Sequence, residues 1–107
     1  MLSISQKSDT LTVRLQGEID HCAAKPMREA IENALAENAV KTLCLDFAEV
    51  TFMDSSGVGM LIGRYKSMAA RGGKTCAVHL NPEIRRLFCM AGLHRIITII
   101  ETEEKDA

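Results

Sequence analysis

The chain has 107 residues, 47% of them hydrophobic, and its 13 basic and 14 acidic residues leave a net charge of −1. A chain of this length forms one domain and hides roughly two-thirds of the surface that its unfolded form exposes, so it can fold without metal or disulfides. The balanced charge excludes the strongly basic surface typical of proteins that bind nucleic acid or anionic membranes.

The four cysteines form no CxxC pair, and Cys44 and Cys76 stand in apolar, strand-like runs. Both are therefore predicted to be reduced thiols of the core. The opening residues, MLSISQKSDT, lack the apolar region of a signal peptide. No apolar run approaches the ~20 residues of a membrane span. These patterns predict a cytoplasmic protein.

Apolar and polar residues alternate over 2–6 and again over 10–16, which predicts two short strands paired as a hairpin. Gly17 is expected to end the second strand. A helix follows, whose start is expected near 23–26 because Pro26 fits a first helical turn. Its apolar face is formed by Met27, Ala30, Ile31, Ala34 and Leu35.

The run at 41–47 is apolar enough for an interior strand, and 58–69 carries apolar residues at helical spacing. Gly72 and Gly73 are expected to stop that second helix. A further strand is predicted over 74–80.

Asn81-Pro82-Glu83 is a strong helix start, since it combines an N-cap, a proline at the first position and an acid at the positive end. Gly92 is expected to close this helix. A last strand is predicted over 95–100, and the charged tail 101–107 is expected to be frayed. The order β-β-α-β-α-β-α-β predicts one α/β domain over 1–107, with a mixed sheet covered by helices.

The stretch FMDSSGVGMLIGRYK at 52–66 places two serines after an acid where a helix begins. In one interpretation the serines only cap the helix. In another, one serine is a nucleophile or the glycines bind a phosphate. However, neither G-x-S-x-G nor the P-loop pattern is present, and the three histidines carry no supporting motif. In a third, a serine is phosphorylated, because a helix N-terminus tolerates the charge of roughly −1.5 to −2 that a phosphate adds.

That stretch, with GEIDH at 17–21 and PEIRRLFCMAGLHRII at 82–97, resembles the bacterial anti-sigma factor antagonists with the STAS fold, and among them the sporulation antagonists. The matching segments stand in family order over nearly the whole chain, and DSSG is the most specific of them. The resemblance implies an STAS-type mixed sheet and a protein that is not an enzyme. General stress-response antagonists of the same fold are the alternative, and a small nucleotide-binding or serine-dependent enzyme is a more remote one.

The resemblance further implies a partner-switching circuit. In that circuit the unphosphorylated antagonist binds an anti-sigma factor that is also a serine kinase, and the sigma factor is released. The kinase uses ATP to phosphorylate the antagonist, which then dissociates, and a metal-dependent PP2C-type phosphatase restores it. The ATP and the metal belong to those partners, so the chain is expected to hold no cofactor or metal. The relatives usually act as monomers.

By position, the resemblance makes Ser55 the phosphorylated residue and leaves Ser56 to support the helix start. The implied partner-binding residues are Asp20, His21, Asp54, Ser55, Ser56, Gly57 and Gly59. Gly57 and Gly59 would let a partner approach closely, unless both simply ease helix packing. Arg64 and Lys66 are expected on a solvated helix face. Met53, Met60 and Met68 are expected to fill the core or its rim.

Overall fold

The computed structural model describes residues 1–101, and the frayed tail predicted for 101–107 lies outside them from residue 102 on. One five-stranded sheet has the strand order β1-β2-β3-β4-β5. The strands are β1 (Leu2–Lys7), β2 (Thr10–Ile19), β3 (Thr42–Met53), β4 (Lys74–Val78) and β5 (Thr98–Ile100). β1 is antiparallel to β2, and the other neighbouring strands are parallel.

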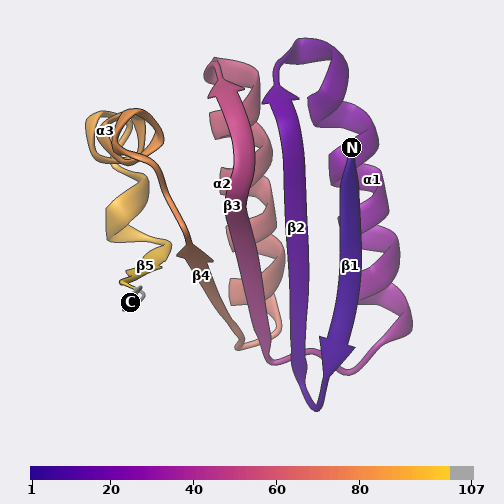
Figure 1. Cartoon of the computed structure of the whole chain (residues 1–107). Helices are drawn as coiled ribbons and strands as arrows, with labels where there is room; N and C mark the ends of the chain where they lie inside the picture. Colours follow the sequence, from indigo (N-terminus) through magenta and orange to yellow (C-terminus); the bar gives the residue numbers. More distant parts are fainter. Residues whose placement is uncertain (102–107) are drawn as a thin grey trace, which may run out of the picture.

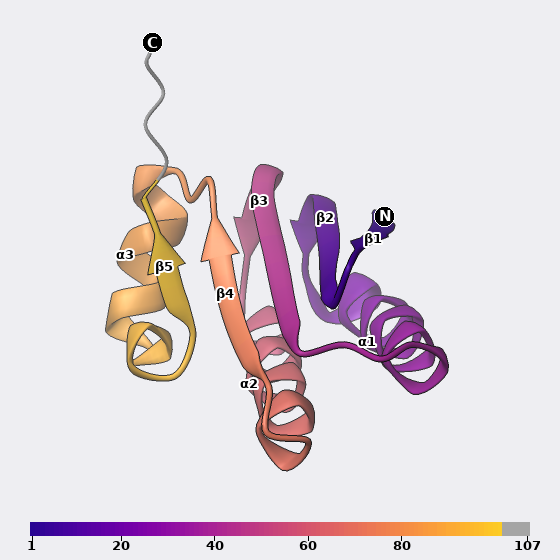
Figure 2. The ribbon, with the colours of Figure 1, turned by 90° about the horizontal axis from the view of Figure 1, so that it is seen from below.

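The helices are α1 (His21–Glu37), α2 (Ser55–Ala70) and α3 (Pro82–Met90), followed by a single 3-10 turn, η1 (Leu93–Arg95). α1 and α2 lie side by side on one face of the sheet, and α3 lies beside β4 and β5 (Figures 1 and 2). The predicted mixed sheet and the predicted order of elements are confirmed. None of the helices in the described part of the chain is long and apolar enough to cross a membrane.

The core lies between the sheet and the two long helices because apolar residues alternate along the central strands. The buried residues of β2 include Leu11, Val13 and Leu15, and those of β3 include Leu43, Leu45 and Phe47. Ile31 of α1 and Leu61 of α2 are also fully buried in this cluster. At the far end, the rings of Phe47 and Phe88 meet edge to face with centroids 5.4 Å apart, which fastens α3 to the sheet.

β2 and β3 both run further than the sequence predicts. Gly17 does not end β2 but adopts a left-handed φ of 82° within it. The register between the two strands shifts once between Arg14 and Gln16 and again between Gly17 and Glu18, and β3 has one extra residue at each shift. These irregularities interrupt the two-residue alternation after Phe47, which is why the prediction stopped β3 at that residue.

α1 begins at His21, earlier than the predicted start at 23–26. Asp20 is its N-cap, with the side chain accepting a hydrogen bond from the Ala23 N–H at 3.0 Å. Pro26 therefore lies in the second turn, where it removes one helical hydrogen bond, and the prediction that it belongs to the first turn is wrong.

The end of the chain differs from the prediction in two ways. β4 ends at Val78 because His79 takes a left-handed φ of 62°. Arg95, the first residue of the predicted last strand, is instead the last residue of η1, which follows Gly92 at a φ of 77°, and β5 begins only at Thr98 and has three residues. The Asn81 cap is confirmed, since its side chain accepts from the Ile84 N–H at 2.8 Å.

Candidate functional site: the start of helix α2 and its surroundings

Asp54, not a serine, caps α2. Its Oδ1 atom accepts hydrogen bonds from the backbone N–H of Ser56 at 2.9 Å and of Gly57 at 3.4 Å. The interpretation in which the serines are the caps is therefore wrong. An aspartate is as good an N-cap as serine and adds a negative charge at the positive end of the helix dipole.

Ser55 and Ser56 are the first two residues of α2. Ser55 is exposed and Ser56 is half-buried. Within residues 1–101 neither hydroxyl takes part in a hydrogen bond, so the expected role of Ser56 in supporting the helix start falls to its backbone N–H rather than its side chain. Because Asp54 carries the cap, the Ser55 hydroxyl is accessible and free of any structural task.

The structure brings Asp20 and His21 to the same end of the sheet as Ser55. Ile19 and Met53 are paired at the ends of the parallel strands β2 and β3, so the residues that follow each strand lie next to one another. Asp20 caps α1 as Asp54 caps α2. His21, which is exposed, shares a groove between the two helices with Ser56.

Gly57 and Gly59 differ although both lie in the first turns of α2. A Cβ atom on Gly57 would lie 2.8 Å from the carbonyl oxygen of Ile19, and Met53 is closer still. Gly57 is therefore required for packing of α2 onto the strand ends. A Cβ atom on Gly59 would meet nothing within 4 Å among the described residues, so packing does not explain that glycine.

The methionines behave as predicted: Met53, Met60 and Met68 are all buried. Arg64 does not. It was expected on a solvated face, but only 6% of it is exposed, and its Nε lies 2.8 Å from Oε2 of Glu32 on α1. The helical pattern failed here because α1 covers that face of α2.

Phe52 was missed by the sequence reasoning. It lies two residues before Asp54 and is 49% exposed, although Met53 beside it is buried. Strand alternation counted backward from Met53 gives the signal that could have revealed it. Aromatic residues are enriched on surfaces that bind proteins.

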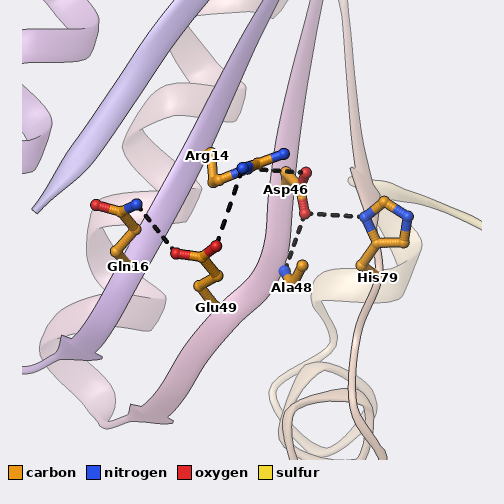
Figure 3. Close-up of polar contacts among 6 residues, drawn as sticks. All are labelled: Arg14, Gln16, Asp46, Ala48, Glu49 and His79. Atoms are coloured by element: carbon orange, nitrogen blue, oxygen red, sulfur yellow. Dashed lines mark hydrogen bonds and ion pairs between the residues drawn. The ribbon is translucent and has the colours of Figure 1, made fainter.

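A polar network occupies the opposite face of the sheet (Figure 3). Asp46 of β3 lies 3.7 Å from Arg14 of β2 and 2.9 Å from Nδ1 of His79, and it accepts a hydrogen bond from the Ala48 N–H at 2.9 Å. Burial would raise the pKa of the Asp46 carboxyl, but the Ala48 N–H, His79 and Arg14 together lower it below its ordinary value. The hydrogen bond from the Ala48 N–H to Asp46 lies at the first register shift of β3 and stabilises the extra residue there.

Within the described residues, no three His, Cys, Asp or Glu side chains are grouped so that they could hold a metal. All four cysteines are free. Cys44 and Cys76 are paired in register across the parallel strands β3 and β4, and the neighbouring Cys44 thiol lowers the pKa of Cys76 against the effect of burial.

The fold and site define a small α/β domain with a mixed sheet, two long helices on one face of it, and an exposed serine directly after the Asp54 cap of α2. The family model for the STAS domain matches residues 1–106. This chain belongs to the STAS family, and the predicted family is confirmed.

Three relatives illustrate the match. The anti-sigma F factor antagonist of Paenibacillus polymyxa is 37% identical over 93 residues, which cover 87% of this chain and 80% of that protein. The anti-sigma-B factor antagonist of Bacillus subtilis is 31% identical over 103 residues, covering 96% and 93%. The solved structure of the anti-sigma factor antagonist SpoIIAA in its unphosphorylated form superposes with a TM-score of 0.84 at 32% identity, covering 98% of this chain and 90% of that one.

Proposed function

We propose that this chain is an anti-sigma factor antagonist whose binding to an anti-sigma factor is switched off by phosphorylation of Ser55. The observation that carries the proposal is that different residues cap α2 and present a free hydroxyl at its start. Asp54 makes the capping hydrogen bonds, so the exposed Ser55 hydroxyl is available to a kinase. The names of the similar proteins support the same role.

The proposed binding surface is the end of the sheet around Ser55. It consists of the residues that the family resemblance implied, with Phe52 added for its exposed ring: Asp20, His21, Phe52, Asp54, Ser55, Ser56, Gly57 and Gly59. Gly57 belongs to it only as the residue that seats α2 against Ile19. Gly59, which packing does not require, leaves open surface for a partner.

Phosphorylation would act through charge. A phosphate on Ser55 adds roughly −1.5 to −2 charges next to the Asp54 carboxylate. The positive end of α2 tolerates this charge, so the domain stays folded. A partner that has buried this surface around a neutral hydroxyl would then have to desolvate a dianion, and it would dissociate.

The partners proposed from the family are an anti-sigma factor that is also a serine kinase and a PP2C-type phosphatase. ATP and metal ions serve those proteins, and the antagonist itself is a non-enzymatic, cytoplasmic monomer that binds neither nucleic acid nor membrane. The sporulation circuit is our first choice. The stress-response circuit is the alternative because the anti-sigma-B antagonist covers 96% of the chain.

The test mixes the purified chain with its cognate anti-sigma factor and ATP and locates the phosphate by mass spectrometry. Phosphate is expected on Ser55. The Ser55→Ala variant should bind the anti-sigma factor whether or not ATP is present, and Ser55→Asp should bind poorly. Ser56→Ala is the matched control and should still be phosphorylated. Phosphate on Ser56 alone, or tight binding by Ser55→Asp, would refute the proposal.

A further inference from the structure

A groove of about 540 Å³ lies between α1 and α2, close to Ser55 but not lined by it. His21, Lys25 and Arg28 line its α1 side. Their spacing of four and three residues places them on one face of the helix. No carboxylate is among the groove's lining residues within the described chain. The groove is therefore positively charged in a protein whose net charge is −1.

Arg64 supplies the deepest charge of the groove. Its side chain is 8% exposed, and its Nε atom pairs with Glu32. Its Nη1 atom is buried and has no hydrogen-bond acceptor among residues 1–101. A buried donor without an acceptor is costly, because it has lost water and gained no partner. Burial lowers the pKa of Arg64, the Glu32 carboxylate acts against this, and the positive charge of Arg28 lowers it further.

Two glycines of α2 leave the α2 side of the groove open. Gly59 and Gly63 both line it, and a Cβ atom added at either would meet nothing within 4 Å in the described part of the chain. Each glycine costs about 1 kcal/mol relative to alanine inside a helix. Neither has a left-handed φ. Local packing and backbone geometry therefore explain neither residue, whereas space for a ligand explains both.

We propose that this groove is a binding site for a phosphate group. The guanidinium groups of Arg64 and Arg28 and the ammonium of Lys25 would surround the phosphate oxygens, and the Ser56 hydroxyl would donate from the helix start. A phosphate matches these donors better than a carboxylate because it offers more oxygens and more charge to several cations at once. The volume leaves room for the group that bears the phosphate.

The phosphate could come from a separate molecule or from phosphorylated Ser55 of the same chain, which directly precedes the groove residue Ser56. The site itself does not rest on the proposed function, since the unphosphorylated chain is sufficient to test it. The probe is inorganic phosphate, titrated into the ¹⁵N-labelled chain at constant ionic strength maintained with sodium chloride.

The expected result is saturable change in the amide signals of Ser56, Gly59 and Gly63 and in the Nε signal of Arg64. Arg28→Ala should weaken phosphate binding about tenfold, which corresponds to about 1.4 kcal/mol. Gly63→Leu should abolish binding while leaving the fold intact, because its Cβ atom enters open space. Arg86→Ala removes an exposed arginine on α3 and is the matched control, with unchanged binding.

Unchanged binding in both Arg28→Ala and Gly63→Leu would overturn the site, as would signal changes that chloride alone reproduces. A second titration uses the chain phosphorylated on Ser55. If added phosphate no longer changes the groove signals, the Ser55 phosphate already fills the groove. If it still does, the ligand is a separate phosphate-bearing molecule. Both results support the site and distinguish its two possible sources.

Discussion

The backbone N–H of Asp54 donates a hydrogen bond to the carbonyl of Ile19 at 3.3 Å. This bond ties the residue that caps α2 to the last residue of β2. The position of Ser55 is therefore set by the strand ends on one side and by the Asp54 carboxylate on the other. Both constraints act through Asp54, and neither uses the serine side chain.

Replacing Asp54 with alanine should lower the free energy of unfolding by about 1–2 kcal/mol, because two helical N–H groups lose their acceptor. Urea denaturation followed by circular dichroism measures this change. Ser55→Ala should alter the free energy by less than about 0.5 kcal/mol, since the exposed hydroxyl makes no hydrogen bond within residues 1–101. Equal losses in the two variants would contradict the assignment of the cap.

Alanine at Gly57 and at Gly59 should have opposite effects. At Gly57 the new Cβ atom would clash with the Ile19 carbonyl, and displacement of α2 should cost about 1–3 kcal/mol. At Gly59 the Cβ atom meets open space, and the higher helix propensity of alanine should add up to about 1 kcal/mol. Thermal unfolding of the two variants measures the difference, since both are glycine-to-alanine substitutions in the same helix. Destabilisation of similar size at both positions would show that the contact with Ile19 is not the cause.

Asp46 should make the stability depend on pH in the acid range. Its pKa lies below the ordinary value of 3.8 in the folded chain, so the unfolded chain takes up the proton first as the pH falls. The stabilisation is complete above about pH 4 and is lost as the pH drops through the folded pKa. Asp46→Asn should therefore cost about 1–3 kcal/mol at neutral pH and less at low pH.

Denaturation curves of wild type and Asp46→Asn between neutral pH and pH 3 would measure this dependence. Glu49→Gln is the control, because Glu49 pairs with the same Arg14 but is half exposed, and its removal should change stability by less than about 1 kcal/mol. A constant difference between wild type and Asp46→Asn across the pH range would exclude the Asp46 carboxylate as its source.

Two ion pairs of similar length should differ in their contribution. The Glu32–Arg64 pair joins α1 to α2 with a buried arginine, whereas the Arg85–Glu101 pair is exposed at 2.7 Å. Glu32→Gln should cost about 1–3 kcal/mol because it leaves a buried guanidinium without its counter-charge. Glu101→Gln should cost less than about 1 kcal/mol. Chemical denaturation decides the point, and similar losses would mean that burial of Arg64 adds nothing to the pair.

Most of the fold could be predicted because the apolar periodicity of this chain is regular where strands and helices are regular. The prediction from periodicity failed where a strand or helix departs from regular geometry. The alternation of β3 breaks after Phe47 because one extra residue is inserted there, and the Asp46 side chain that stabilises the insertion gives no local signal. Pro26 misplaced the start of α1, since a proline is tolerated in its second turn when Asp20 supplies the cap.

At the candidate site, the sequence predicts Ser55 and its neighbours as functional residues, but it does not predict that Asp54 alone makes the capping hydrogen bonds. DSSG contains three possible caps, and only the backbone path decides that Asp54 performs the task. Gly57 is crowded and Gly59 is not because of how α2 packs against the end of β2. Arg64 is buried because α1 lies over it. The residue spacing within α2 predicts neither of these contacts. The phosphorylation of Ser55 stays a prediction.

Because Asp54 caps α2, the sequence at residue 55 can evolve without loss of the helix start. The side chain of residue 55 contributes no hydrogen bond within residues 1–101, so most substitutions there should affect partner binding and leave folding nearly unchanged. A gene duplicate could lose the switch, or acquire a permanently charged residue in its place, by a single codon change without first acquiring compensating mutations. Regulation and architecture can therefore diverge independently in this lineage.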